Sequence, residues 1–280
     1  MAPFELVAPR TAEEAVAELR AASGTSVGVL AGGSDLLIDI DEGRVAPTRI
    51  VSLRRLPWRT LDWTGGALTI GSTLPLRTLE DDPDVRRRLP GLWQAIRAVG
   101  SVALRHRATL GGNLGRAAPS SDLIPILLAL DAEVELVGAE GTRRLPVDRF
   151  VLASRRTALR PAELIRSIRI PEARPSAFLW QRVRPANDIS QIAVAVARSP
   201  GARAWSVAVG GIPPRSVLLP RVAEALGHGS PTPAALDRAA DLASREVAIV
   251  ADRRASGEYR RHLIGTLLRR AVASAEAARS

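Results

Sequence analysis

The chain has 280 residues, of which 46% are hydrophobic, and this length and composition favour a sizeable core divided between two domains. Its formal net charge of +10 comes entirely from arginine, which is dispersed and not interleaved with aromatic residues, so nucleic-acid binding is not favoured. The absence of cysteine excludes disulfides, cysteine-ligated iron–sulfur clusters and a cysteinyl flavin link within this chain.

The N-terminal segment predicts an amphipathic helix and not a targeting signal. It carries Glu5, Glu13 and Glu14 and lacks a basic region followed by an apolar region, so no secretory signal is expected. Thr11 and Glu14 form a capping box that predicts an amphipathic helix through about residue 22. Since the chain also has no apolar run long enough to span a bilayer, we expect a cytoplasmic protein.

Short β-prone runs dominate the next part of the chain. A strand is predicted over 27–30, directly before the glycine-bearing phrase 31–36 (AGGSDL). A second strand is predicted over 50–53. Two further strands flank Gly65-Gly66, a pair typical of a tight hairpin; they span 61–64 and 67–70.

A second glycine-bearing phrase, 109–114 (TLGGNL), lies in the middle of the chain. A helix is predicted over 92–99, and the segment 106–114 is expected to cross a loop that contains this phrase. Ser120 or Ser121 can cap a helix that runs through 124–130. A strand is then predicted over 134–137.

Pro171 and Pro175 indicate a boundary between two parts of the chain. Strand-like runs precede helices in the part that follows, which indicates an α+β layer. The strands are expected over 189–197 and 204–209, and the helices over 220–226, 233–251 and 256–278.

The two glycine phrases are the strongest functional signal. Adjacent glycines let backbone N–H groups turn toward one point and let a ligand approach closely, and such a cluster suits a phosphate or a pyrophosphate. The chain has neither the lysine of a Walker A loop nor a GxGxxG sequence. Its three histidines, His106, His228 and His262, are far apart and do not indicate a zinc site.

The stretch 95–131, AIRAVGSVALRHRATLGGNLGRAAPSSDLIPILLALD, resembles the flavin-binding medium subunit of the molybdenum hydroxylases, the group of carbon monoxide dehydrogenase and xanthine dehydrogenase. The phrase LAGGSDLL at 30–37 resembles the other FAD loop of that family. Further similar stretches lie at 182–197, 207–217 and 256–272, so the resemblance covers essentially the whole chain in order.

The resemblance implies an α+β fold with two domains. Residues 1–172 are expected to form a two-lobed FAD-binding domain of the vanillyl-alcohol-oxidase (PCMH) type. Residues 173–280 are expected to form a smaller α+β C-terminal domain that packs against the isoalloxazine ring.

The resemblance also names the residues expected at the FAD site, which divide into two loops and three single positions. The loops are expected to donate backbone N–H groups, and the Ser34 hydroxyl, to the pyrophosphate. They consist of Ala31, Gly32, Gly33, Ser34, Asp35 and Leu36, and of Thr109, Gly111, Gly112 and Asn113. The side chain of Asp35 is expected to point away, because a carboxylate beside a pyrophosphate is repelled.

The three single positions are Asp122, Ile165 and Gln181. Asp122 can accept hydrogen bonds from sugar or ribityl hydroxyls, or it can simply begin a helix, and the two roles are compatible. Ile165 and Gln181 correspond more loosely to positions that line the flavin, and ordinary packing is an equal alternative for both. Gln181 replaces the lysine common in the family, which puts a cationic contact with the ring in doubt.

The function implied is electron transfer through non-covalently bound FAD, with no catalytic residue and no metal ligand in this chain. In the family, a large subunit carries the molybdenum cofactor and a small subunit carries [2Fe–2S] clusters, and a dimer of heterotrimers is expected. Two alternatives remain open at this point: a self-sufficient FAD-dependent oxidase, and an assembly module that has lost the flavin. The substrate, the electron acceptor and the stoichiometry do not follow from the sequence.

Overall fold

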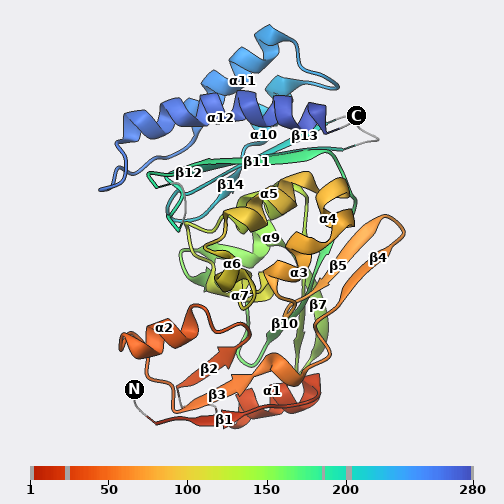
Figure 1. Ribbon diagram of the computed structural model, residues 1–280, viewed down its shortest axis with the longest axis vertical. Coiled ribbons are helices and arrows are strands. Elements are labelled where there is room, and N and C mark those ends of the chain that lie inside the picture. Colours follow the sequence, from red (N-terminus) through yellow and green to blue (C-terminus); the bar gives the residue numbers. More distant parts are fainter. Residues whose placement is uncertain (1–2, 23–25, 185–186, 200–203, 279–280) are drawn as a thin grey trace.

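The computed structural model describes residues 3–22, 26–184, 187–199 and 204–278 of the chain. In Figure 1 the elements are stacked along the long axis of the molecule. An N-terminal lobe lies at the bottom, a group of helices with a second sheet lies in the middle, and a third sheet covered by α11 and α12 lies at the top. The fold is therefore of mixed α and β type, as the sequence predicts.

The N-terminal lobe is a small parallel sheet with two helices. Its strands are ordered β1-β3-β2, with β1 and β2 each parallel to β3. The elements are β1 (Glu5–Val7), α1 (Ala12–Ala21), β2 (Val27–Leu30), α2 (Leu36–Asp41), β3 (Arg49–Ser52) and the 3-10 turn η1 (Leu53–Arg55). The cap at Thr11 is confirmed, because the Glu14 amide donates to Thr11 Oγ1 at 3.1 Å, but Glu14 Oε2 accepts from the Arg10 amide at 2.7 Å in place of the Thr11 amide. β2 ends directly at the first glycine phrase.

The middle of the molecule is an antiparallel sheet surrounded by helices, in the order β4-β5-β10-β6-β7. Its strands are β4 (Leu61–Thr64), β5 (Ala67–Gly71), β6 (Glu133–Gly138), β7 (Gly141–Pro146) and β10 (Leu164–Ile170). The helices are α3 (Leu76–Asp81), α4 (Pro83–Arg88), α5 (Pro90–Ala98), α6 (Val102–Arg105), α7 (Leu110–Arg116), α8 (Leu123–Ala129) and α9 (Val147–Phe150). A separate hairpin pairs β8 (Val151–Ala153) with β9 (Arg156–Thr157).

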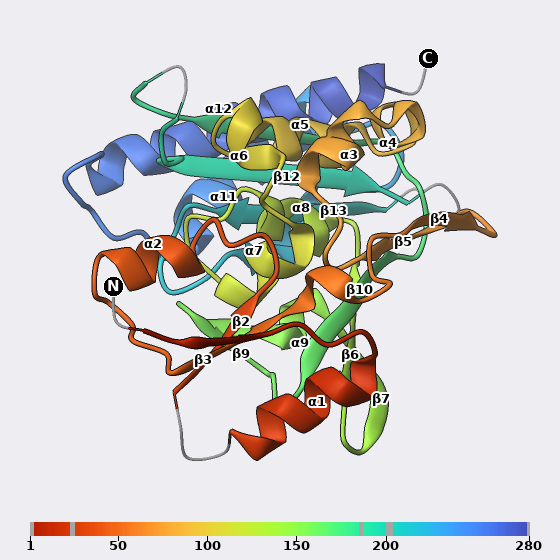
Figure 2. The same cartoon turned by 60° about the horizontal axis from the view of Figure 1, so that its bottom comes forward.

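The C-terminal part is a second antiparallel sheet with helices on one face. Its strands are β11 (Ser176–Gln181), β12 (Ile192–Arg198), β13 (Trp205–Gly210) and β14 (Val217–Leu218), in that spatial order. The helices are α10 (Pro220–Leu226), α11 (Pro233–Glu246) and α12 (Gly257–Ala277). Figure 2 shows α12 lying along this sheet, and in Figure 1 it lies on the side away from the middle of the molecule.

One hydrophobic core joins the middle of the molecule to the C-terminal sheet. It includes Leu92 on α5 and Ile126 on α8 together with Phe178 on β11 and Ala195 on β12, all of them fully buried. A second core lies between the other face of the same sheet and helices α10 to α12. The C-terminal sheet is therefore buried on both faces.

The structure differs from the sequence-based expectations in its element bounds and in elements that the sequence does not predict. The predicted loop over 106–114 contains the start of α7, and the helix predicted over 233–251 ends at Glu246. Strands β10 and β11 are among the elements that the sequence does not predict. The α11 helix ends because Val247 turns to extended backbone and is buried, only 4% exposed, in the second core.

Two negative observations concern the described residues alone. None of their helices is both long enough and apolar enough to cross a membrane. They also contain no group of three or more histidine, aspartate or glutamate side chains placed to hold a metal ion.

Candidate functional site

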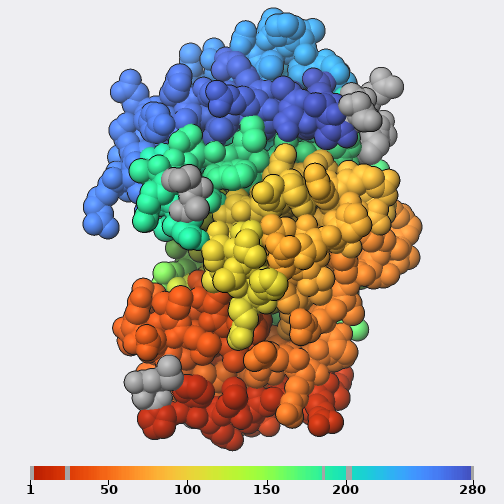
Figure 3. Space-filling model, viewed as in Figure 1, coloured from red at the N-terminus to blue at the C-terminus, as the bar shows by residue number. Residues whose placement is uncertain are grey.

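A cavity of about 500 Å³ lies between the N-terminal lobe and the middle of the molecule, and both glycine phrases line it. Figure 3 shows a recess between the red-orange N-terminal segment and the yellow and green segments. Ten of the thirteen residues predicted from the sequence lie in the cavity wall. They are Ala31, Gly32, Ser34, Asp35, Leu36, Thr109, Gly111, Gly112, Asn113 and Ile165.

The first glycine loop joins β2 to α2 and offers unpaired amides. The backbone N–H groups of Gly32, Gly33, Ser34 and Asp35 donate to no other residue in the described part of the chain. Gly33 has φ of +83°, the left-handed region that glycine adopts without strain. A residue of left-handed backbone between residues of ordinary backbone is the pattern from which anion-binding turns are built.

The two loops pack directly on each other. A Cβ atom added to Gly32 would lie 2.0 Å from the Arg107 carbonyl oxygen, so only glycine permits this approach. The second loop begins the short helix α7, where Thr109 Oγ1 accepts the Gly112 amide at 2.9 Å. The cap explains why a phrase with two glycines is helical here and not a free loop.

The glycines of the second loop have different roles. A Cβ on Gly111 would lie 2.5 Å from Ser72 Cβ and 2.6 Å from the Ser72 carbonyl oxygen, so this glycine is needed for packing. A Cβ on Gly112 would approach only Thr109 Oγ1, at 3.0 Å, and Ala31 Cβ, at 3.9 Å. Gly112 is exposed and faces the cavity. The Gly112 amide is already engaged by Thr109, which the sequence did not reveal.

Apolar side chains form much of the cavity wall. Val99 and Leu104 come from the segment between α5 and α6 and from α6 itself. Leu159, Leu164 and Ile165 come from the loop before β10 and from β10 itself. A mostly apolar wall with a few polar groups is typical of a ligand site.

Four charged residues line the cavity: Asp35, Asp39, Arg116 and Glu163. Sequence reasoning named only the first. Arg116 Nη1 donates to Asp39 Oδ2 at 2.5 Å and Nη2 to Oδ1 at 3.1 Å. The guanidinium groups of Arg116 and Arg44 hold the pKa of the Asp39 carboxyl below its ordinary value.

The charge of Glu163 is likewise balanced by an arginine, in this case one that does not line the cavity. Its carboxylate accepts two hydrogen bonds of 2.7 Å from the Arg143 guanidinium, and this contact lowers the pKa of Glu163. A weak signal for the other missed pair was present in the sequence. Asp39 follows the first glycine phrase and Arg116 follows the second, each within about one helical turn.

Three predicted residues lie outside the cavity wall. Gly33 faces the interior, where an added Cβ would lie 3.0 Å from Leu30 Cδ1. The Gln181 side chain donates to the Arg182 carbonyl oxygen at 2.8 Å. Asp122 is only 8% exposed and binds the C-terminal part of the chain: Oδ1 accepts from Ser190 Oγ at 2.5 Å and Oδ2 from Arg182 at 3.1 Å.

Burial raises the pKa of Asp122 to about 6, although the hydrogen bond from Ser190 and the charge of Arg182 act in the opposite direction. The carboxyl group therefore titrates at a higher pH than an ordinary aspartate. It links the start of α8 to the segment that follows β11.

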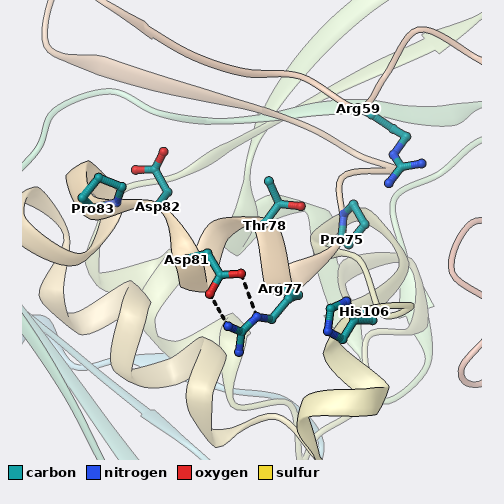
Figure 4. Close-up of a pocket in the computed structure, with 8 residues that line it drawn as sticks. All are labelled: Arg59, Pro75, Arg77, Thr78, Asp81, Asp82, Pro83 and His106. Carbon is teal, nitrogen blue, oxygen red and sulfur yellow. Dashed lines mark hydrogen bonds and ion pairs between the residues drawn. The ribbon is translucent and has the colours of Figure 1, made fainter.

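A separate depression of about 490 Å³ lies on the outer surface near α3 and is drawn in Figure 4. Its wall is polar and includes Arg59, Arg77, Asp81 and His106, with Arg77 Nε donating to Asp81 Oδ2 at 2.7 Å. None of the predicted site residues lines it. His106 thus faces this outer depression and is not part of the cavity between the glycine loops.

Comparisons with known proteins agree along the whole chain. Residues 2–173 match the family model described as the FAD binding domain in molybdopterin dehydrogenase. Residues 178–275 match the CO dehydrogenase flavoprotein C-terminal domain.

Curated relatives are similar over most of their length. The carbon monoxide dehydrogenase medium chain of Hydrogenophaga pseudoflava is 28% identical over 278 residues, which cover 97% of this chain and 96% of the relative. The nicotinate dehydrogenase FAD-subunit of Eubacterium barkeri is 30% identical over 82% of this chain and 81% of its own.

Among solved structures, the fold is similar to carbon monoxide dehydrogenase from Hydrogenophaga pseudoflava, determined without the Mo-pyranopterin moiety of its cofactor. The TM-score is 0.91 at 28% identity, covering 99% of this chain and 98% of that one.

Proposed function

Because the chain belongs to the FAD-binding medium subunits of the molybdenum hydroxylases, we propose that it is the electron-transfer subunit of such an enzyme. It would stand between the [2Fe–2S] clusters of a small partner subunit and an external electron acceptor. A large partner subunit would carry the molybdenum cofactor and oxidise the substrate. We assign residues 1–172 to the FAD-binding domain and 173–280 to the C-terminal domain, and expect a cytoplasmic dimer of heterotrimers.

The observation that carries this proposal is the convergence of two glycine loops from different lobes on one cavity. Each loop alone has the composition of an ordinary turn. Together they line one cavity that has both unpaired amides and apolar side chains in its wall. FAD has the matching form, since a pyrophosphate separates its two aromatic halves.

The residues present fit FAD by two tests. The unpaired amides of residues 32–35 need acceptors, and phosphate oxygens are suitable ones. The exposed face of Gly112 leaves space that a side chain would fill, which permits a close approach by the ligand. A volume of about 500 Å³ also lies in the range of cofactor sites.

When bound, FAD supplies reversible electron uptake and release at its isoalloxazine ring. The chain's own residues bind and orient the cofactor. We assign the pyrophosphate to the amides of Gly32, Ser34 and Asp35, with the Ser34 hydroxyl and the Asn113 side chain as further contacts. The apolar walls exclude water from the two halves.

We place the isoalloxazine against Val99 and Leu104 of the cavity wall. Arg182, which follows β11 of the C-terminal sheet, donates to the Ala98 carbonyl oxygen, so that sheet is anchored next to Val99. The adenosine half would then lie against Ile165. The chain has no cysteine, and none of its three histidines lines the cavity, which supports a non-covalent site with no catalytic residue of its own.

The proposal predicts that the isolated chain binds FAD but oxidises no hydroxylase substrate. The full chain is purified, loaded with FAD and mixed anaerobically with an aldehyde, a purine or carbon monoxide while the flavin absorbance is followed. We expect no bleaching with these substrates and full bleaching with dithionite or with a reduced iron–sulfur partner. Bleaching by a substrate with the chain alone would instead support a self-sufficient oxidase, and failure to bind FAD would support a flavin-free module.

A further inference from the structure

The cavity between the glycine loops has an unfavourable charge for the ligand proposed above. Its described wall contains the carboxylates Asp35, Asp39 and Glu163 but a single cation, Arg116. The pyrophosphate of FAD is itself an anion, and like charges in a partly desolvated site repel each other. The charge of Arg116 therefore matters more than that of an arginine on an open surface.

Arg116 is also placed where it joins the two loops. It lies on the last turn of α7, the helix that begins with the second glycine loop, while Asp39 lies on α2, which follows the first. The two residues are 77 positions apart in the sequence and form a bidentate pair. Such a pair fixes direction as well as distance, because the guanidinium is planar and rigid.

The surroundings make this pair more than a surface ion pair. The Asp39 side chain is only 4% exposed and that of Arg116 is 23% exposed. Arg116 Nε also lies 3.6 Å from Asp35 Oδ1, at the end of the first glycine loop. Arg44 holds Asp39 from the other side, with Nη1 2.6 Å from Oδ1. Asp39 thus keeps a cationic partner if Arg116 is removed.

We propose that Arg116 is a positioning residue for FAD: by binding Asp39 it fixes the two glycine loops around the pyrophosphate, and it offsets the negative charge that gathers there. This inference rests on the proposed function. The Arg116–Asp39 pair has a role that the glycine phrases cannot have, since backbone amides orient the pyrophosphate but carry no net charge.

The test uses the full chain stripped of flavin, with Arg116→Gln as the main variant. Arg215→Gln is the matched control, because Arg215 is 28% exposed and binds Asp148 outside this cavity. FAD binding is measured from the quenching of flavin fluorescence at low and at high salt. The thermal unfolding of the flavin-free proteins is recorded in parallel.

We expect Arg116→Gln to raise the dissociation constant of FAD by roughly tenfold to a hundredfold, the range for losing a hydrogen-bonded charge. We also expect the salt dependence of this variant to shift toward tighter FAD binding at high salt, since salt then screens the repulsion of the remaining carboxylates and no longer screens an attraction by Arg116. Arg215→Gln should match the wild type in both measurements. Asp39→Asn removes one wall carboxylate but also the partner that positions Arg116, so it should weaken binding less than Arg116→Gln does. The double variant should be no weaker than Arg116→Gln alone.

Three results would overturn the inference: wild-type affinity in Arg116→Gln, weaker binding with an unchanged salt dependence, or additive effects of the two substitutions. If Arg116→Gln unfolds at a much lower temperature, Arg116→Lys keeps the charge without the bidentate contact. Arg116→Lys should then show an intermediate affinity for FAD with wild-type salt dependence. Wild-type affinity in Arg116→Lys would count against the inference. Failure of the wild-type chain itself to bind FAD would instead contradict the proposed function.

Discussion

Asp122 shows how a single buried residue can make stability depend on pH. Its carboxylate connects α8 to the segment after β11 through Arg182 and Ser190. Burial raises the pKa of this group to about 6, against an ordinary value of 3.8. The folded state therefore binds a proton more tightly than the unfolded state does. The stability that this proton contributes is present below about pH 4 and is lost as the pH rises through 6.

Asp122→Asn removes this dependence. We expect the free energy of unfolding of the wild type, relative to that of the variant, to fall by at most about 3 kcal/mol between pH 4 and 8. Urea unfolding of both proteins across this range measures it. Asp188→Asn is a control with the opposite pH dependence. The backbone amides of Arg184 and Ile189 lower the pKa of Asp188, so the contribution of Asp188 to stability is lost at acidic pH instead. A difference between wild type and Asp122→Asn that does not change with pH would contradict the prediction.

The adjacent glycines of the second loop should respond differently to the same substitution. Gly111→Ala places a Cβ 2.6 Å from the Ser72 carbonyl oxygen and should destabilise the flavin-free chain by about 1–3 kcal/mol. Gly112→Ala should leave the fold closer to the wild type and chiefly weaken FAD binding, because its Cβ enters the cavity. Thermal unfolding and flavin titration of both variants separate the two effects. Equal losses of affinity without loss of stability would show that both glycines face the ligand.

At the scale of elements, the sequence predicts those whose signals are local. The helix cap at Thr11, the strand over 27–30 and the helix over 220–226 all have such signals and are confirmed. β10 and β11 are strands because of their neighbours: β10 pairs with β5 and β6, and β11 pairs with β12. The sequence LIRSIRI has no strict alternation, so its place at the centre of a sheet depends on partners far along the chain.

The same reasoning explains what could be predicted about the site. Each glycine phrase can be recognised in a single sequence because its glycines are adjacent. The Arg116–Asp39 pair gives only a weak signal, because its members come together only when α7 packs near α2. The contacts of Asp122 with Arg182 and Ser190 likewise form only after the C-terminal sheet docks.

Helix α5 provides a test of how tightly the elements pack. Gly91 lies at its first turn against β11, and its amide donates to Ser176 Oγ at 3.2 Å. A Cβ at this position would lie 2.8 Å from Ile126 Cδ1 and 2.9 Å from the Ala177 nitrogen. We expect Gly91→Ala to lower the free energy of unfolding by about 1–3 kcal/mol in urea titration. Gly257→Ala at the start of α12 is the control, since its Cβ would meet only ordinary contacts of 3.7 Å or more. An equal loss of stability in both variants would contradict this account.

At the scale of the whole molecule, the position of the histidines bears on how FAD is retained. His106 lies in the outer depression of Figure 4, His228 in a groove beside β14, and His262 on α12. None of them reaches the cavity between the glycine loops. Acid denaturation should therefore release the flavin quantitatively into the supernatant. A flavin-modified histidine peptide in the precipitate, detected by mass spectrometry, would contradict a non-covalent site.

The core shared by α5, α8 and the C-terminal sheet determines what would happen if the chain were divided into two fragments. A fragment ending at residue 172 would expose Leu92 and Ile126 to water, and the complementary fragment would expose Phe178 and Ala195. We expect neither piece to be soluble on its own, and we expect two halves separated by a protease to stay bound to each other. The two family domains therefore depend on each other to close this core.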